Sequence, residues 1–171
     1  MADTDLHERL GSLASLLAKT FRSGGQVLVC GNGGSCADAT HFAEEWTGRF
    51  HKDRHPYPVM AINDGAHITC TANDYGFDQI FARTVSAFAR ENDLLFVLST
   101  SGNSQNLILA AQAAHSNRAQ VVGFLGRGGG NLAAECDWVW VAPGKTADRI
   151  QELHMLALHA LIQVTEEVLC G

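Results

Sequence analysis

Five short apolar segments alternate along the chain with longer segments of helical periodicity. Apolar runs of this length, bounded by glycine and polar residues, are typical of strands that are buried on both faces of a parallel sheet. The helical segments between them supply the crossover connections that parallel strands need. The predicted strands are residues 26–30, 59–62, 93–99, 120–125 and 137–141.

Helices are predicted between these strands and at both ends of the chain. Leucines recur at helical spacing in the first segment, residues 1–22, and a long apolar segment, residues 146–169, predicts a closing helix. Shorter helices are expected near 35–46, 76–90, 105–114 and 131–135. The sequence therefore predicts one α/β domain over residues 1–171, with three layers and a five-stranded parallel sheet flanked by helices.

Composition restricts the partners of such a domain. The formal net charge of -6 argues against nucleic-acid binding, which depends on basic patches. No stretch approaches the roughly 20 apolar residues of a membrane span, and the first ten residues lack a signal-peptide core. The five scattered cysteines are typical of reduced thiols. We expect a cytoplasmic protein that binds neither nucleic acid nor membrane, and that holds anions with local hydrogen-bond donors.

One loop is rich in such donors. Ser99, Thr100, Ser101 and Ser104 supply four hydroxyls within six residues, between a predicted strand and a predicted helix. The N-terminus of a helix adds unpaired N–H groups and a partial positive charge. Helix capping is the alternative, but a cap needs only one or two hydroxyls. The segment therefore favours a phosphate site.

Two further loops are rich in glycine. Residues 31–35, Gly-Asn-Gly-Gly-Ser, follow the first predicted strand but match neither the GxGxxG dinucleotide pattern nor a P-loop, which needs a lysine. A tight turn and a ligand site shared with the serine-rich loop are both open interpretations. Residues 126–130 are expected to form a flexible connection.

Polar residues mark the second predicted helix. His41 and Glu45 are four residues apart and share a face, so they could ligate one metal ion or form an acid–base pair. A surface ion pair is the alternative. Glu44 is expected to point elsewhere, into solvent.

Polar residues also mark the last predicted helix. Asp148, Gln151 and His159 fall within an arc of roughly 80°, whereas His154 lies about 140° from His159. A core role is the alternative for a histidine in so apolar a helix. Elsewhere, the pair at 73–74 is expected in a loop and the pair at 64–65 in a plain turn.

In combination and in order, the segments GNGGS, HFAEEWTGRF, ANDYGFDQIF, STSGNS and ADRIQELH resemble the phosphoheptose isomerases over residues 23–171. The resemblance implies an SIS-type fold. It also implies the conversion of sedoheptulose 7-phosphate to D-glycero-D-manno-heptose 7-phosphate, the first step toward the ADP-heptose of bacterial lipopolysaccharide or surface glycans. A homotetramer with shared active sites is implied as well. Its geometry stays open, because family members commonly carry an additional N-terminal helix.

The resemblance further implies roles for individual residues. Glu45 and His159 would be catalytic, and zinc would be bound by His41, Glu45, Gln151 and His159. Whether Glu45 acts as base, metal ligand or both is open. The implied substrate-binding residues are Asn32, Gly33, Gly34, Glu45, Asn73, Asp74, Ser99, Thr100, Ser101, Ser104, Asp148 and Gln151.

Two other functions are compatible with such a fold. A non-catalytic SIS protein would bind a partner, such as a replication initiator, or sense a sugar phosphate. Such relatives tend to lose the glutamate of the HFAEE segment, so the presence of Glu45 and His159 favours an enzyme. A flavin- or nucleotide-binding domain is the third interpretation, but the loops carry no nucleotide signature.

Overall fold

The computed structural model describes residues 4–170, and its centre is a parallel sheet in the order β2-β1-β3-β4-β5. Central strand β3 pairs with both neighbours, so that Phe96 lies beside Val29 of β1 and Val122 of β4. The predicted sheet is confirmed, and each strand end lies within one residue of its predicted position. The strands are β1 (Val27–Gly31), β2 (Val59–Ala61), β3 (Leu94–Ser99), β4 (Gln120–Leu125) and β5 (Trp138–Val141).

Six α-helices and two short 3-10 helices occur in the described chain. The N-terminal prediction is confirmed from residue 4 onward, while residues 1–3 and 171 of the predicted domain lie outside the described part. The helices are α1 (Thr4–Arg22), α2 (Gly34–Thr47), α3 (Gly65–Tyr75), η1 (Phe77–Gln79), α4 (Ala82–Phe88), α5 (Gln105–Ser116), η2 (Asn131–Glu135) and α6 (Ala147–Cys170).

The region between β2 and β3 differs from its prediction. The pair at 64–65 was expected to form a plain turn, but the Asp64 carboxylate accepts a hydrogen bond of 2.7 Å from the His67 N–H and caps α3. Asn73 and Asp74 therefore lie in the last turn of a helix and not in a loop. The single helix predicted over 76–90 is instead two elements, η1 and α4. Neither contains Gly76, which takes a φ of 88° and ends the preceding helix.

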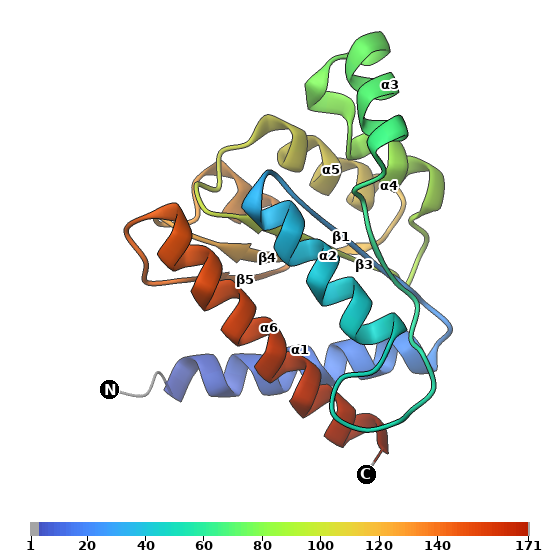
Figure 1. The fold of residues 1–171 in the computed structure, drawn as a ribbon, viewed down its shortest axis with the longest axis vertical. Coiled ribbons are helices and arrows are strands. Elements are labelled where there is room, and N and C mark those ends of the chain that lie inside the picture. Colours follow the sequence, from blue (N-terminus) through green and yellow to red (C-terminus); the bar gives the residue numbers. More distant parts are fainter. Residues whose placement is uncertain (1–3, 171) are drawn as a thin grey trace.

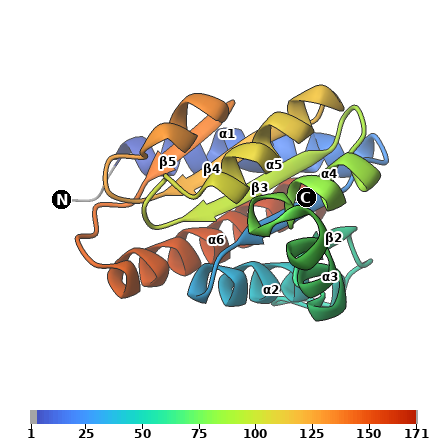
Figure 2. The ribbon, with the colours of Figure 1, turned by 90° about the horizontal axis from the view of Figure 1, so that it is seen from above.

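Helices cover both faces of the sheet (Figure 1), with α2 and α6 on one side and α4 and α5 on the other (Figure 2). Alternate residues of β3 pack on opposite faces of the sheet. Phe96 and Leu98 belong to the core under α1, α2 and α6, and Leu95 and Val97 belong to the core under α4 and α5. Burial on both faces is why the strands are apolar throughout.

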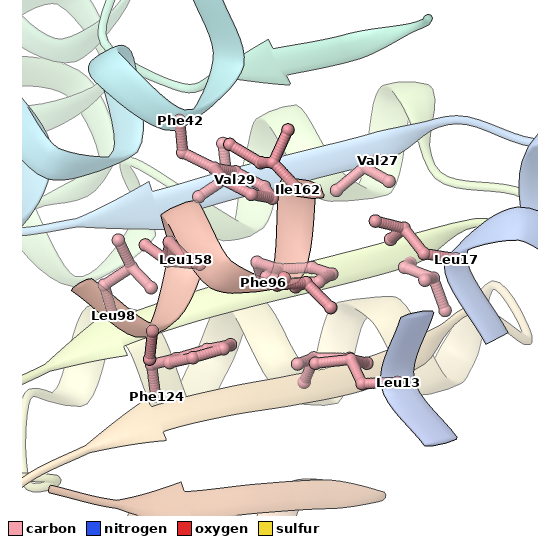
Figure 3. Close-up of a cluster of buried hydrophobic side chains, with 14 of the residues drawn as sticks. Leu13, Leu17, Val27, Val29, Phe42, Phe96, Leu98, Phe124, Leu158 and Ile162 are labelled. Atoms are coloured by element: carbon pink, nitrogen blue, oxygen red, sulfur yellow. The ribbon is translucent and has the colours of Figure 1, made fainter. Parts of the chain in front are cut away.

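The core on the α2 and α6 side orients these two helices. Phe42 of α2 and Leu158 and Ile162 of α6 converge on Phe96 and its neighbours in the sheet (Figure 3). Fully burying one such side chain contributes about 1.5–3 kcal/mol. Because both helices are anchored through these apolar residues, their polar residues are held at the seam between them.

Candidate active site

The two predicted ligand loops meet where the order of the strands reverses. β1 lies between β2 and β3, so the crossovers on its two sides run in opposite directions and leave a crevice at the carboxyl ends of the strands. The loop at 31–34 follows β1, and the serine-rich loop at 99–104 follows β3. The structure therefore brings both glycine- and serine-rich segments to one place.

A pocket of about 50 Å³ lies between these loops. This volume holds roughly four water molecules, which suits a group the size of phosphate. Ser104 is the N-cap of α5, yet its hydroxyl makes no capping hydrogen bond, and the residue lines the pocket. Capping alone therefore does not explain its presence. The lining residues are Asn32, Ser35, Leu98, Ser99, Thr100, Ser101, Ser104 and Leu107.

The serine-rich loop is braced by the loop at 126–130, which sequence reasoning treated as a flexible connection. Gly102 takes a φ of 66°, and a Cβ there would lie 1.9 Å from the carbonyl oxygen of Gly129. The Gly102 carbonyl accepts a hydrogen bond of 2.8 Å from the Leu132 N–H, and the Asn103 side chain accepts one of 3.0 Å from the Asn131 N–H. The third loop is thus a packed support for the pocket.

Asn106 is a site residue that sequence reasoning missed. Its side chain is 2% exposed, and its amide and that of Asn32 exchange two hydrogen bonds of 2.9 and 2.8 Å. This pair ties the loop after β1 to the first turn of α5. Only the high asparagine content of these segments could have signalled it, because the partners are 74 positions apart.

Helices α2 and α6 run side by side in the same direction (Figure 1). Near the N-terminal ends of the two helices, Gly34 of α2 touches the side chain of Gln151. A Cβ on Gly34 would lie 2.5 Å from the amide nitrogen Nε2 of Gln151. Gly33, the preceding residue, is the N-cap of α2. The small residues at the start of α2 therefore make room for a polar group of α6.

Two turns or more further along the same helices, His41 and Glu45 of α2 meet His159 of α6. The Nε2 atoms of the two imidazoles are 3.0 Å apart, and Oε1 of Glu45 is 3.5 Å from Nε2 of His41. One ligand-type atom from each of the three residues lies within 4.8 Å of the others. The Phe50 ring lies 5.7 Å from the His159 ring. Two imidazoles and a carboxylate thus converge at a partly exposed position.

This donor set fits a zinc ion. Two nitrogen ligands at about 2.0 Å from a tetrahedral ion lie roughly 3.3 Å apart, close to the separations observed here. Nδ1 of His41 is 3.4 Å from Oε1 of Glu44, as expected for an outer carboxylate that orients a ligand imidazole. Glu44 is exposed as predicted, but it contacts His41 rather than solvent alone.

Asp38, one turn before His41 on α2, is a second residue that sequence reasoning missed. Its Oδ2 atom is buried without a hydrogen-bond partner. Burial raises the pKa of Asp38 to about 6, and the nearby His41 partly offsets this effect. A carboxyl group whose pKa is raised by burial therefore lies one helical turn from His41.

Three predicted substrate residues lie outside this cluster within one chain. Asn73 and Asp74 are exposed at the end of α3 and hydrogen-bond to each other at 2.7 Å. Asp148 is exposed in the first turn of α6, where hydrogen bonds from the Thr146 side chain and the Arg149 backbone lower its pKa. None of the hydrogen bonds among residues 4–170 joins these three to His41, Glu45 or His159.

His154 is a core residue, the alternative considered for the last helix. Its ring is fully buried against Phe124 and Trp140, and its Nε2 atom is 3.0 Å from the carbonyl oxygen of Leu125. Burial lowers the pKa of His154. Of the two histidines of α6, only His159 faces α2.

Comparison with known proteins first identifies the domain family to which the chain belongs. Residues 2–126 match the SIS domain family. The fold agrees with solved structures of two phosphoheptose isomerases, from Neisseria gonorrhoeae (TM-score 0.88, 39% identity) and Francisella tularensis (TM-score 0.90, 36% identity). Each alignment covers 94% of this chain and 86% of the solved chain.

Curated relatives narrow the class to a family. The phosphoheptose isomerase of Fusobacterium nucleatum is 49% identical over 157 residues, which are 92% of this chain and 81% of the relative. That of Yersinia enterocolitica is 47% identical over 168 residues, 98% of this chain and 87% of the relative. This chain belongs to the phosphoheptose isomerase family, and the family predicted from the motifs is confirmed.

Proposed function

We propose that this chain is an aldose–ketose isomerase that converts sedoheptulose 7-phosphate to D-glycero-D-manno-heptose 7-phosphate. The names of its relatives agree with this activity. The observation that carries the proposal is the convergence of Glu45, His159 and His41 within 4.8 Å, at the seam between α6 and α2, a helix whose first turn borders a phosphate-sized pocket. The product would supply the heptose of bacterial lipopolysaccharide or surface glycans.

The spacing of the two parts of the site suits a seven-carbon substrate. Ser35 borders the phosphate pocket, and His41 lies six residues further along α2, about 9 Å at the helical rise of 1.5 Å per residue. An extended chain advances roughly 1.2 Å per bond, so the seven bonds from the substrate C2 to phosphorus span about 8 Å. A phosphate held by the hydroxyls of Ser99, Thr100, Ser101 and Ser104 would place the reacting carbons at the imidazole pair.

The reaction moves a proton between adjacent carbons and passes through an enediolate. The Glu45 carboxylate would remove the proton from one carbon and return it to the other. The His159 imidazole would exchange a proton with the substrate oxygens, and N–H groups near them would stabilise the developing negative charge. Gln151, Asn32, Gly33 and Gly34 would border the sugar.

Zinc would be held by His41, Glu45, Gln151 and His159. A bound zinc ion polarises a carbonyl oxygen as a Lewis acid. A glutamine amide is a weak ligand, and the Gln151 side chain lies against Gly34 at the start of α2 rather than beside His159. Zinc removal by a chelator should therefore be easy, and activity should return when zinc is added.

A homotetramer with shared sites would give roles to the residues outside the cluster. Asn73, Asp74 and Asp148 are exposed within one chain. We propose that they contact the sugar at a boundary between subunits. The measured mass of the assembly in solution tests the tetramer.

We also propose that the protein acts in the cytoplasm and binds neither nucleic acid nor membrane. Among residues 4–170 no helix has both the length and the apolar composition needed to cross a bilayer. The cysteines at 30, 36, 70 and 136 are free thiols, which fits a reducing compartment.

The experiment is to incubate the purified protein with sedoheptulose 7-phosphate and to follow the heptose product by NMR. Turnover that is lost in Glu45→Gln and His159→Gln is the expected result. Normal turnover in both variants would remove the acid–base assignment. Calorimetric binding of the sugar phosphate without any product would instead assign the protein to the non-catalytic SIS proteins.

A further inference from the structure

Arg54 is the most extensively bonded buried charge in the described chain outside the cluster of His41, Glu45 and His159. It lies in the loop between α2 and β2, and its side chain is only 4% exposed. Its guanidinium donates to the backbone carbonyls of Glu45 at 2.7 Å and Trp46 at 2.9 Å. The same group lies over the ring of Trp46 at 5.2 Å from the centroid.

These bonds cap the C-terminal end of α2. The last carbonyls of a helix have no partner within it and carry a partial negative charge. The last turn of α2 contains no basic residue, so the cation is supplied from the following loop. One of the two capped carbonyls belongs to Glu45, the residue whose side chain is the proposed base.

The counter-ion of Arg54 comes from the other helix of the site. Nε of Arg54 is 2.5 Å from Oε1 of Glu166 on α6, whose side chain is 12% exposed. Glu166 follows His159 by seven residues, about two turns, so both lie on nearly the same face of α6. One guanidinium is therefore bonded to the backbone of Glu45 and to the face of α6 that carries His159.

The two helices are consequently joined on both sides of the reacting groups. Gly34 and Gln151 are in contact toward the phosphate pocket, and Arg54 links Glu45 to Glu166 at the opposite end. We propose that Arg54 is a positioning residue: together with Glu166 it fixes the offset of α2 along α6, and thereby the separation between the Glu45 carboxylate and the His159 imidazole. The proposal rests on the proposed isomerase function of this cluster.

The chemistry of the pair explains why a lysine cannot replace this arginine. Guanidinium presents five N–H donors in a rigid plane and can bond two carbonyls and a carboxylate at once, whereas an ammonium group is a single flexible point. Proton transfer is sensitive to placement, and an error of about 1 Å can reduce a rate by roughly 100-fold. The hydroxyls that would bind phosphate make no hydrogen bond to Arg54 or Glu166 in the described chain.

The test compares Arg54→Lys and the double variant Arg54→Met/Glu166→Leu with a matched exposed pair, Arg118 and Glu91, whose side chains are 78% and 63% exposed. Replacing a buried ion pair by apolar residues of similar size is often neutral for stability, so the double variant should fold. In both Arg54 variants kcat should fall about tenfold or more, with KM within about twofold of the parent. The corresponding Arg118→Lys and Arg118→Met/Glu91→Leu variants should match the parent.

A second readout is independent of activity. NMR signals of the His41 and His159 imidazoles should shift in both Arg54 variants and stay in place in both Arg118 variants. If folded Arg54 variants keep a kcat within about twofold of the parent, or if their imidazole signals do not move, the positioning role is refuted. Should the double variant fail to fold, kcat and the imidazole signals of Arg54→Lys alone test the positioning role. Failure of both to fold would make the pair a determinant of folding and also refute the proposal.

Failure of the proposed function gives a different result. A parent protein that does not turn over sedoheptulose 7-phosphate would refute the isomerase assignment alone. The imidazole signals would then still decide whether Arg54 sets the spacing between α2 and α6.

Discussion

The serine-rich loop and the pair of helices α2 and α6 form the two halves of the proposed site, and they are built in opposite ways. The loop draws its hydroxyls from one stretch, residues 99–104, placed by a strand end and a helix start. The helix pair joins residues far apart, such as His41 and His159, which are 118 positions apart and in contact at 3.0 Å. The proposed binding groups are thus local in sequence, whereas the proposed reacting groups are brought together by tertiary packing.

This difference has an energetic consequence. On the proposed function, removing one hydroxyl of the loop would remove one contact to the bound phosphate and leave the others. Moving either helix would change the separation of the groups proposed to exchange protons. The account therefore predicts that loop changes alter KM and that helix-pair changes alter kcat.

The largest effect is expected at Glu45. Glu45→Gln removes the proposed base while keeping the shape of the side chain, and kcat should fall by about 10³, within the range attributed to general acid–base catalysis. Steady-state kinetics on sedoheptulose 7-phosphate measure it. Glu44→Gln is the matched comparison. It acts only through Nδ1 of His41 and should reduce kcat by about tenfold. Equal effects at Glu44 and Glu45 would remove the distinction between them.

A smaller but still large effect is expected at Gly34. In Gly34→Ala the new methyl group would collide with the amide of Gln151, at 2.5 Å from Nε2. Because this amide is the movable end of a side chain, the protein should fold, and displacement of Gln151 should reduce kcat by roughly 100-fold.

The control for Gly34 is Gly11→Ala in the interior of α1, where no atom lies within 4 Å of the added Cβ. This change should leave kcat unaltered and stabilise the fold by about 0.5–1 kcal/mol. Parental kcat in Gly34→Ala would show that the contact between Gly34 and Gln151 has no part in the chemistry.

A moderate effect, on KM alone, is expected in the serine-rich loop. Ser104→Ala removes one hydroxyl from the phosphate pocket and should raise KM about tenfold, because a hydrogen bond to a charged group contributes about 1.5–3 kcal/mol. Ser116→Ala, at the other end of α5, should change neither constant, because its hydroxyl is exposed and bonded to the Gln112 carbonyl. A fall in kcat without a rise in KM would contradict the division between the two halves.

The smallest effect concerns stability and separates the two histidines of α6. Burial lowers the pKa of His154, so the folded state resists its protonation more than the unfolded state does. Stability is complete above the ordinary histidine pKa of about 6.5 and declines as the pH falls below it. Each kcal/mol lost lowers Tm by roughly 2–4 °C in a domain of this size.

The corresponding measurement is Tm against pH for the parent and for His154→Gln, which keeps a donor for the Leu125 carbonyl. The parent should lose stability relative to the variant between pH 7 and pH 5. Parallel curves for the two proteins would show that His154 has no part in this pH dependence.

The sequence predicted the sheet closely because the strands are short apolar runs, and because β1 and β3 end at Gly31 and Ser99, where glycine- and serine-rich loops begin. It predicted the serine-rich loop for the same local reason. It did not predict α3, since the capping bond from the His67 N–H to Asp64 distinguishes a helix start from a turn only in three dimensions. The roles of Asn106 and Arg54 were also missed, because their partners lie 74 and 112 positions away.

Only some of the residues predicted to bind the sugar come together within one chain. Gln151 and His159 lie at the seam with α2, as their shared face on α6 indicated. Asn73 and Asp74 do not reach that seam, because α3 follows the edge strand β2 and lies away from α6 (Figure 1). Their predicted role requires a second subunit and stays a prediction.

Proton exchange in heavy water measures most directly whether the helix pair moves a carbon-bound proton while the serine-rich loop only binds the substrate. The protein and sedoheptulose 7-phosphate would be incubated in D₂O and the sugar carbons followed by NMR. We expect deuterium on the reacting carbon with the parent and with Ser104→Ala at saturating substrate, and none with Glu45→Gln. Deuterium incorporation at the parental rate in Glu45→Gln would contradict this expectation.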